Sequence, residues 1–290
     1  MEFKTIGLFG HMRSQDIRET VATICTFLQN KQCKIVLESS LAESLGETHF
    51  KVANMQEMGT TIDLALVIGG DGALLSTARA MVAYKVPLLG INRGSLGFLT
   101  DIRPTEVEQK LEEILAGKFH IENRFLLETT IIDNNTTQQG HALNEIVLSA
   151  QGAHHLIQYE IIVDKHFVCR QRADGLIIAT PTGSTAYSLS GGGPIIHPEL
   201  NALTLVPMFP HTLSMRPIVI NGDSTILLRV KENLNSQIQI SCDSQTFYPV
   251  NENSVIEIRK KQESITLIHP TSYNYYKSLR SKLHWGSGLV

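Results

Sequence analysis

The sequence predicts an α/β N-terminal domain with a Rossmann-like parallel sheet, followed by a mainly β C-terminal sandwich domain. Three observations predict this architecture. Short apolar runs alternate with helix-like periodicity up to about residue 122, a glycine cluster follows the most apolar of these runs, and short β-like runs dominate after it. We therefore expect an α/β domain at 1–122 and a β-rich domain at 123–269, with the tail 270–290 packing back on the first domain.

The first domain reads as strands joined by crossover helices. Strands are expected at 5–9, 34–37, 63–68 and 86–91. A helix is expected after the first strand, because apolar residues recur at helical spacing at Ile17, Val21, Ile24 and Leu28. A second helix is expected at 74–82. Thr105 and Glu108 form a capping-box pattern, which would start a third helix that ends near Gly117.

The second domain shows many short strand-like runs with few helical stripes between them. These runs lie at 126–132, 145–148, 157–163, 167–170, 225–230, 237–240, 255–258 and 265–268. Such a series is typical of two packed β-sheets. Residues 273–285 regain helical character.

Composition excludes several classes of protein. The chain has 290 residues, 42% of them hydrophobic, which is enough for a substantial core and argues against disorder. The net charge of −3 gives no basic field for nucleic acid. The four cysteines form no Cys-x-x-Cys pair, so neither a zinc site nor a disulfide framework is expected. No apolar run approaches the roughly 20 residues that span a bilayer, so we expect a cytoplasmic enzyme.

The sharpest local motif is Gly69-Gly70-Asp71-Gly72, which lies between a buried strand and a helix. Open α/β sheets bind ligands at this position, and glycines let the backbone approach a phosphate. The carboxylate of Asp71 would repel an anion, so it fits better as the acceptor for a substrate hydroxyl. The alternative is a tight turn whose aspartate caps the next helix. No Walker A or Gly-x-Gly-x-x-Gly motif accompanies the cluster, which disfavours a P-loop enzyme or a Rossmann dehydrogenase.

The longest motif is the segment 174–194, in which a short apolar strand leads into small hydroxyl residues and glycines. Such a segment can supply several hydrogen-bond donors to a polar ligand that lies close to the backbone. A flexible linker is the alternative, but the ordered apolar residues and the tyrosine disfavour it.

Together these motifs resemble the NAD kinase family. The further matching segments are Asn144-Glu145 and residues 90–100, 210–214 and 273–276. They follow the order of the family and extend from about residue 60 to the end of the chain. This concurrence is much more specific than any single motif.

The resemblance implies an active site between an α/β and a β domain, completed by a neighbouring subunit of a homodimer or homotetramer. It implies that Asp71 faces the 2′-hydroxyl of the adenosine ribose, and that NAD and ATP are the ligands. The residues expected to contact the substrates are Gly70, Gly72, Phe98, Asn144, Glu145, His155, Arg172, Asp174, Thr185, Ala186, Tyr187, Ser188, Leu189, Ser190 and Gln245. Ser244 departs from the family, which usually has glycine before Gln245.

Simpler interpretations exist for some of these residues. Asn144-Glu145 could be a polar turn, Arg172 and Asp174 could form a surface ion pair, and His155 could be an ordinary exposed histidine. His197 and His211 lack partners at a ligand spacing, so no metal site built from protein side chains is assigned.

The predicted reaction is transfer of the terminal phosphoryl group of ATP to NAD, with Mg²⁺ bound mainly by the triphosphate. Two alternatives remain open at this point. A lipid kinase would share the Gly-Gly-Asp-Gly loop but needs an apolar acceptor pocket, and a non-catalytic regulator would bind NAD without producing NADP.

Overall fold

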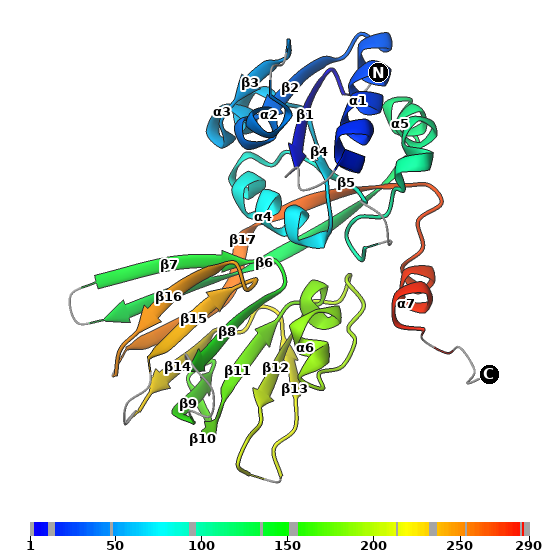
Figure 1. Ribbon diagram of the computed structural model, residues 1–290. Coiled ribbons are helices and arrows are strands. Elements are labelled where there is room, and N and C mark those ends of the chain that lie inside the picture. The colour runs from blue at the N-terminus through cyan, green and yellow to red at the C-terminus, as the bar shows by residue number, and fades with distance from the viewer. Residues whose placement is uncertain are drawn as a thin grey trace. The chain divides into compact units, whose positions relative to one another are not determined.

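The computed structural model divides the chain into two compact units (Figure 1). One unit comprises Met1–Asn123 and Ile265–Val290, and the other comprises Arg124–Ser264. The strands β6 (Phe119–Asp133) and β17 (Val255–Pro270) contribute residues to both. The structure describes residues 3–10, 15–46, 49–92, 97–133, 136–150, 156–212, 214–231, 237–252, 254–284 and 286.

The first unit is built on a parallel sheet, as the sequence predicts, and its strand order is β3-β2-β1-β4-β5. Its strands are β1 (Thr5–Gly10), β2 (Lys34–Glu38), β3 (Lys51–Ala53), β4 (Leu64–Ile68) and β5 (Leu88–Ile91). Its helices are α1 (Gln15–Asn30), α2 (Ser39–Leu45), α3 (Met55–Thr61), α4 (Asp71–Met81), α5 (Val107–Leu115) and α7 (Tyr275–Leu283). Every residue of β4 is buried, as expected for a parallel strand covered on both faces.

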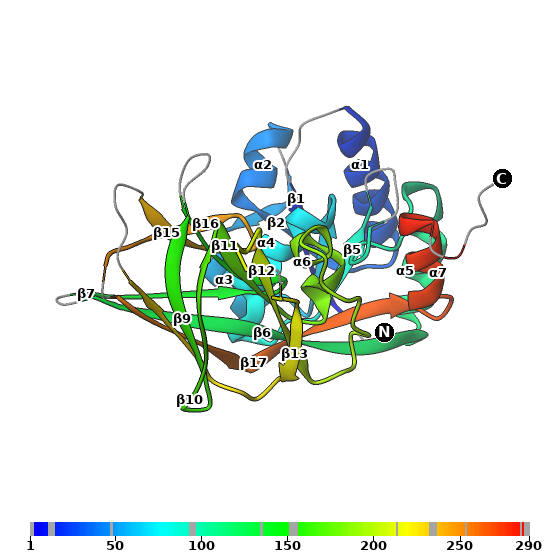
Figure 2. The ribbon, with the colours of Figure 1, turned by 90° about the horizontal axis from the view of Figure 1, so that it is seen from below.

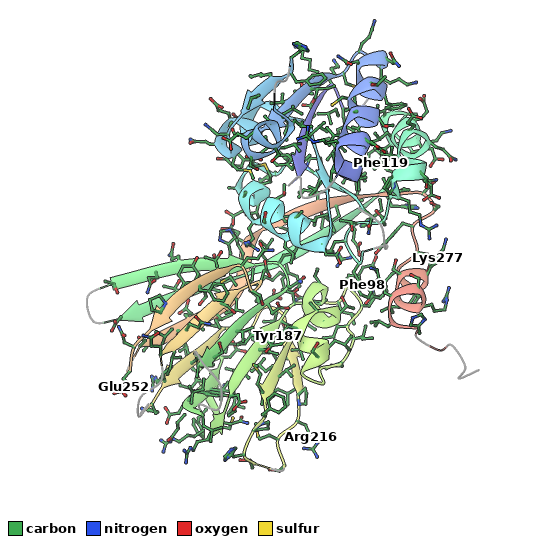
Figure 3. The ribbon with its side chains drawn as sticks, viewed as in Figure 1. Phe98, Phe119, Tyr187, Arg216, Glu252 and Lys277 are labelled. Carbon is green, nitrogen blue, oxygen red and sulfur yellow. The ribbon has the colours of Figure 1, made fainter. Side chains whose placement is uncertain are left out.

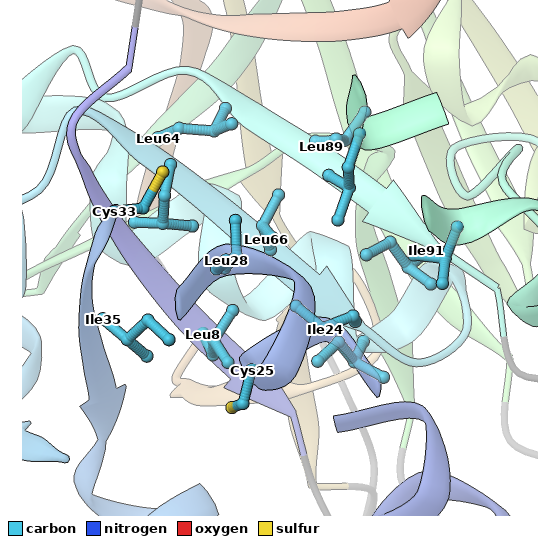
Figure 4. Packing of buried hydrophobic residues seen from close by; sticks show 14 of the residues in the cluster. Leu8, Ile24, Cys25, Leu28, Cys33, Ile35, Leu64, Leu66, Leu89 and Ile91 are labelled. Atoms are coloured by element: carbon cyan, nitrogen blue, oxygen red, sulfur yellow. The ribbon is translucent and has the colours of Figure 1, made fainter. Parts of the chain in front are cut away.

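The helices cover the sheet on two sides. Figure 4 shows the core on one face, where Ile24 and Leu28 of α1 pack against Leu8 and Leu66 of the strands. Helix α5 lies beside α1 and buries Leu111 and Ile114 in the same core. On the opposite face, α3 comes so close to β1 that a Cβ at Gly7 would lie 2.8 Å from the Met58 methyl carbon. The expected apolar stripe of α1 is confirmed at Val21, Ile24 and Leu28, while the side chain of Ile17 lies outside the described residues.

The structure corrects two details of the sequence prediction. Thr105 does not cap a helix. Pro104 starts a 3-10 turn (Pro104–Glu106), so Thr105 lies inside that turn, and α5 begins at Val107 without a side-chain cap. The second correction concerns the strands expected at 255–258 and 265–268, which are parts of the single strand β17.

The second unit is an antiparallel β sandwich. One sheet has the order β13-β12-β11-β8-β15-β16, and the other contains β10-β9-β14-β17 with the hairpin of β6 and β7. Figure 2 shows β9 and β10 running alongside each other. The bounds are β7 (Thr136–Ala142), β8 (Glu145–Ala150), β9 (Ile157–Val163), β10 (His166–Ala173), β11 (Gly175–Ala179), β12 (Ala202–Met208), β13 (Ile218–Asn221), β14 (Ile226–Val230), β15 (Ile238–Cys242) and β16 (Thr246–Val250).

One hydrophobic cluster joins the inner faces of these two sheets. It contains Leu148 and Ile178 from the first sheet and Tyr159, Leu228 and Ile256 from the second, all at most 1% exposed. The predicted sandwich is therefore confirmed. Among the described helices of the chain, none is long and apolar enough to cross a bilayer.

Candidate active site

The glycine cluster lies at the carboxyl edge of the parallel sheet, directly after β4. Gly70 is the N-cap of α4 and Asp71 is its first residue. The alternative interpretation of Asp71 as a helix cap is wrong, because Gly70 occupies the cap position and the Asp71 carboxylate binds donors outside α4.

The Asp71 carboxylate accepts hydrogen bonds from a turn that follows β5. The backbone N–H of Phe98 (labelled in Figure 3) donates to Oδ2 at 2.9 Å. The Leu99 N–H and the Thr100 hydroxyl donate to Oδ1 at 3.1 and 3.2 Å. A carboxylate has about four acceptor directions, so these three bonds, counted over the described residues, leave about one, on Oδ2. The half-buried side chain can thus accept one more hydrogen bond.

The turn is itself tightly held. The buried Asn92 side chain donates to both the carbonyl and the hydroxyl oxygen of Thr100, each at 3.1 Å. A Cβ at Gly97 would lie 2.1 Å from Asp71 Oδ1, so only glycine fits there. Asn92 and Thr100 were not among the residues predicted to contact the substrates. The sequence feature that could have identified Asn92 is its position directly after a buried strand, at the sheet edge that also carries Asp71.

In the second unit, Asn144 and Glu145 lie in a turn that enters β8. The carboxylate of Asp243 accepts hydrogen bonds from the backbone N–H groups of Leu143 (3.0 Å), Asn144 (2.7 Å) and Glu145 (3.3 Å). The Asp243 N–H donates back to the Glu145 carbonyl at 3.0 Å. Asp243 is 4% exposed, so this clamp is buried.

The other side of this turn contacts the start of the 3-10 helix η3 (Thr182–Thr185). The Thr180 N–H donates to the Asn144 carbonyl at 2.9 Å, and its hydroxyl donates to the Leu143 carbonyl at 2.6 Å. A Cβ at Gly183 would lie 2.2 Å from the Asn144 carbonyl oxygen. Asp243 and Thr180 therefore fix the backbone of Asn144 and Glu145. The sequence predicted this role for neither residue, although Thr180 lies in the segment 174–194, because neither stands next to the residues that it holds.

Three of the predicted substrate-binding residues carry buried polar atoms with no hydrogen-bond partner among the described residues. These atoms are Asn144 Oδ1, Glu145 Oε2 and Ser188 Oγ. The three residues are 9%, 3% and 0% exposed. Unpaired buried polar atoms are costly, so they call for a partner such as a bound polar ligand.

The carboxyl group of Glu145 has a raised pKa. Burial and the negative charge of Asp243 raise the pKa of Glu145 to about 8, although the Tyr187 backbone N–H favours the ionised form. At neutral pH the protonated carboxyl predominates. Glu145 can therefore donate a hydrogen bond to a ligand as well as accept one.

Two family models match the chain, one for each half. The ATP-NAD kinase N-terminal domain matches residues 6–119, and the ATP-NAD kinase C-terminal domain matches residues 143–270. The NAD kinase of Pseudomonas entomophila (strain L48) is 46% identical over 289 residues, which cover 99% of this chain and 98% of that protein. The NAD kinase of Azotobacter vinelandii (strain DJ) is 45% identical over 288 residues, with the same coverage. The chain belongs to the NAD kinase family.

Solved structures of this family share the fold. A crystal structure of yeast NADH kinase complexed with NADH superposes with a TM-score of 0.91, at 24% identity, covering 100% of this chain and 90% of that one. An NAD kinase from Archaeoglobus fulgidus in complex with ATP gives a TM-score of 0.74 at 22% identity, covering 97% and 98%. The predicted family, fold class and phosphotransferase class are confirmed, and the lipid-kinase alternative is wrong.

The remaining predicted residues of this NAD kinase family member lie on several elements. Thr185 ends η3, and Ala186 precedes the short helix α6 (Tyr187–Ser190), whose exposed Tyr187 is labelled in Figure 3. Arg172 is exposed on β10, and Asp174 is half-buried directly before β11. Among the described side chains these two form no ion pair. His155 lies outside the described residues.

The departure at Ser244 has a structural consequence. Asp243, Ser244 and Gln245 connect β15 and β16, and the Gln245 N–H donates to the Cys242 carbonyl at 3.0 Å. Asp243 and Ser244 are left-handed, with φ of 51° and 54°. Left-handed backbone favours glycine. Ser244 therefore adopts this conformation at some energetic cost, and Gln245 is exposed beside it.

Proposed function

We propose that the chain transfers the γ-phosphoryl group of ATP to the 2′-hydroxyl of the adenosine ribose of NAD, giving NADP. The observation that carries the proposal is the geometry of Asp71 within a member of the NAD kinase family. Its carboxylate lies at the ligand-binding edge of a parallel sheet, is held by three donors, and keeps one acceptor direction on Oδ2. A ribose hydroxyl can donate there.

In this mechanism Asp71 orients the hydroxyl and accepts its proton late, as the bond to phosphorus forms. Phosphoryl transfer needs an aligned acceptor and little covalent help from the protein, and a carboxylate is a weak base that acts mainly in the transition state. The three donors keep its oxygens fixed, so little reorganisation accompanies the reaction. A carboxylate at this place also disfavours a ribose that already carries a 2′-phosphate, because like charges repel.

The second unit would hold the dinucleotide. Asn144 Oδ1, Glu145 Oε2 and Ser188 Oγ are buried and without partners among the described residues, so polar groups of NAD would satisfy them. By resemblance, His155, Arg172, Asp174 and Gln245 would add further contacts. We also propose the domain roles that the sequence predicts, an α/β domain with the Gly-Gly-Asp-Gly loop and a β-rich domain for NAD, assembled in a homodimer or homotetramer.

Mg²⁺ would be bound mainly by the triphosphate. The Asp71 carboxylate fits this assignment, since donors of the protein already take three of its roughly four acceptor directions and leave too few for a cation cage. When bound, the ion neutralises phosphate charge. Asp71 keeps the separate task of orienting the hydroxyl.

The deciding experiment incubates the protein with NAD, ATP and Mg²⁺ and detects NADP with an NADP-specific dehydrogenase. Asp71→Asn keeps the shape but removes a basic oxygen, so turnover should fall at least about a hundredfold, the lower range for a general base. Asp63→Asn is the matched control, because Asp63 also accepts two backbone N–H groups but lies at the opposite end of β4.

Each arm of this experiment has a contrary outcome. NAD binding without any NADP would indicate the non-catalytic regulator instead. Near-normal turnover in a folded Asp71→Asn variant would remove Asp71 from the mechanism. A comparable loss in Asp63→Asn would mean that general destabilisation explains both variants.

A further inference from the structure

A buried histidine lies between two carboxylates in the first unit. His269, near the end of β17, is 1% exposed. Its Nδ1 makes a 2.9 Å hydrogen bond with Asp101 Oδ2, and its Nε2 lies 3.1 Å from Glu122 Oε2. The ring stacks on Tyr273 with centroids 3.9 Å apart. None of these residues has a part in the proposed reaction.

The surroundings favour the charged form of this imidazole. Burial lowers the pKa of His269, but the carboxylates of Asp101 and Glu122 raise it more, so it lies above the ordinary value. The Asp101 and Glu122 side chains are only 7% and 14% exposed. Among the described residues, the ionisable groups in contact with the ring are Asp101 from the segment after the turn, Glu122 from β6, and Tyr273 from the turn before α7.

Asp101 connects this cluster to the turn that holds Asp71. It directly follows Thr100, whose hydroxyl donates to Asp71 Oδ1 and whose carbonyl accepts from the Asn92 side chain. On its other side, Ile102 pairs with Ile91 of β5. The backbone at 100–102 is therefore fixed to the sheet, and the Asp101 side chain is anchored by His269.

We propose that His269 is a positioning residue whose protonated ring, held between Asp101 and Glu122, fixes the turn at 97–101 and thereby the donors that orient Asp71. The inference rests on the proposed role of Asp71. It assigns a role to a side chain outside the Gly-Gly-Asp-Gly loop and the NAD-binding residues. It also makes turnover depend on a proton bound at a site away from the reacting atoms.

Loss of that proton changes the balance of charge. A neutral imidazole leaves two nearly buried carboxylates facing each other without a cation between them, which is unfavourable. Asp101 then moves away from the ring, and the adjacent Thr100 hydroxyl and Leu99 N–H lose their fixed geometry. Because Asp71 acts in the chemical step, kcat should fall at alkaline pH while the KM values change little.

Three variants test the proposal: His269→Gln, Glu122→Gln and His120→Gln. His269→Gln should lower kcat at neutral pH about tenfold or more, since small displacements of catalytic groups cost up to about a hundredfold. KM for NAD and ATP should stay within about threefold of wild type. His120→Gln is the matched control, because His120 is an exposed histidine on the same strand as Glu122 and should keep the wild-type kcat.

Glu122→Gln separates positioning from mere stability. It removes one of the two charges that favour imidazolium, so the alkaline fall in kcat should begin at lower pH than in wild type. Histidine NMR, with the His269 signals identified by their absence in His269→Gln, should show the same displacement of the ring titration.

The outcomes distinguish this inference from the proposed function. If wild type forms no NADP, the function fails; if Asp71→Asn retains turnover, the role of Asp71 fails. If both hold, a wild-type kcat and pH profile in His269→Gln overturns the positioning role. It is equally overturned if the profile of Glu122→Gln does not move, and this second criterion decides alone if His269→Gln does not fold.

Discussion

Replacing Glu145 with glutamine should stabilise the protein at alkaline pH and have much less effect in acid. The wild-type side chain is 3% exposed and lies beside the carboxylate of Asp243. Burial and that charge raise the pKa of Glu145 to about 8. Glutamine has nearly the same shape and stays neutral at every pH, so it removes the cost of ionising a buried acid.

The size of the effect follows from proton linkage. A folded-state pKa above the unfolded value means that the folded protein binds the proton more tightly, so its stability falls as pH rises between the two values. For a carboxyl whose pKa rises from 4.5 to about 8, this amounts to on the order of 5 kcal/mol, at about 1.4 kcal/mol for each pH unit. Relaxation of the site will reduce the measured figure, and several kcal/mol should remain.

The assay is urea unfolding of wild type and variant without ligand at pH 5, 7 and 9. The difference in unfolding free energy should grow from pH 5 to pH 7 and level off above the folded-state pKa of about 8. Glu160→Gln is the control: it makes the same change of net charge, but its expected effect on stability has the opposite sign. The hydrogen bond with Arg170 is the main cause that lowers the pKa of Glu160. This pair should therefore stabilise the wild-type protein above the unfolded-state pKa, and the stabilisation should be lost in acid. A constant difference between Glu145→Gln and wild type from pH 5 to 9 would refute the reasoning.

Three further predictions concern the second unit. Ser244→Gly should raise the unfolding free energy by about 0.5–1 kcal/mol, because φ of 54° is strained for serine, and an unchanged urea midpoint would contradict this. Asp243→Asn should lower the unfolding free energy by about 1–3 kcal/mol, because an amide N–H would face the buried Leu143 N–H. KM for NAD should also rise, because Asn144 loses its fixed position. An unaltered KM would argue against the role of Asp243 in holding this turn. Arg172→Gly should change the ratio of NAD to NADH turnover, as the family resemblance implies, and steady-state kinetics with an unchanged ratio would reject this role.

The elements that the sequence predicted are those with a strong local pattern. The run that became β4 is wholly apolar and ends at a glycine pair, and the stripe of α1 recurs at Val21, Ile24 and Leu28. Two other elements lack such a pattern. Helix α2 has seven residues and depends on the Glu38 side chain, which accepts hydrogen bonds from the Ser40 and Leu41 N–H groups. Strand β7 is largely polar and forms through its pairing with β6.

The candidate site was predictable where motif and position coincide, and hidden where the contacts are distant. Asp71 follows from the Gly-Gly-Asp-Gly loop after a buried strand. Asp243 binds N–H groups of residues 98–100 positions away in the sequence, and no local spacing predicts such a contact. The pKa of Glu145 was equally hidden, because it depends on burial and on Asp243 rather than on the Asn-Glu motif itself.

The same arrangement, an aspartate bound to the N–H groups of a turn, occurs twice in the structure, and the exposure of the aspartate determines whether it can also contact a ligand. Asp71 and Asp243 both bind the backbone N–H groups of a turn with one carboxylate. Asp243 is 4% exposed and binds three N–H groups inside the fold, so its burial keeps a substrate from its carboxylate. Asp71 is half-buried and keeps an acceptor direction on Oδ2. An aspartate therefore stabilises the fold at position 243 and is available for chemistry at position 71. The sequence around the two residues does not predict this difference, because it depends on burial in the folded protein.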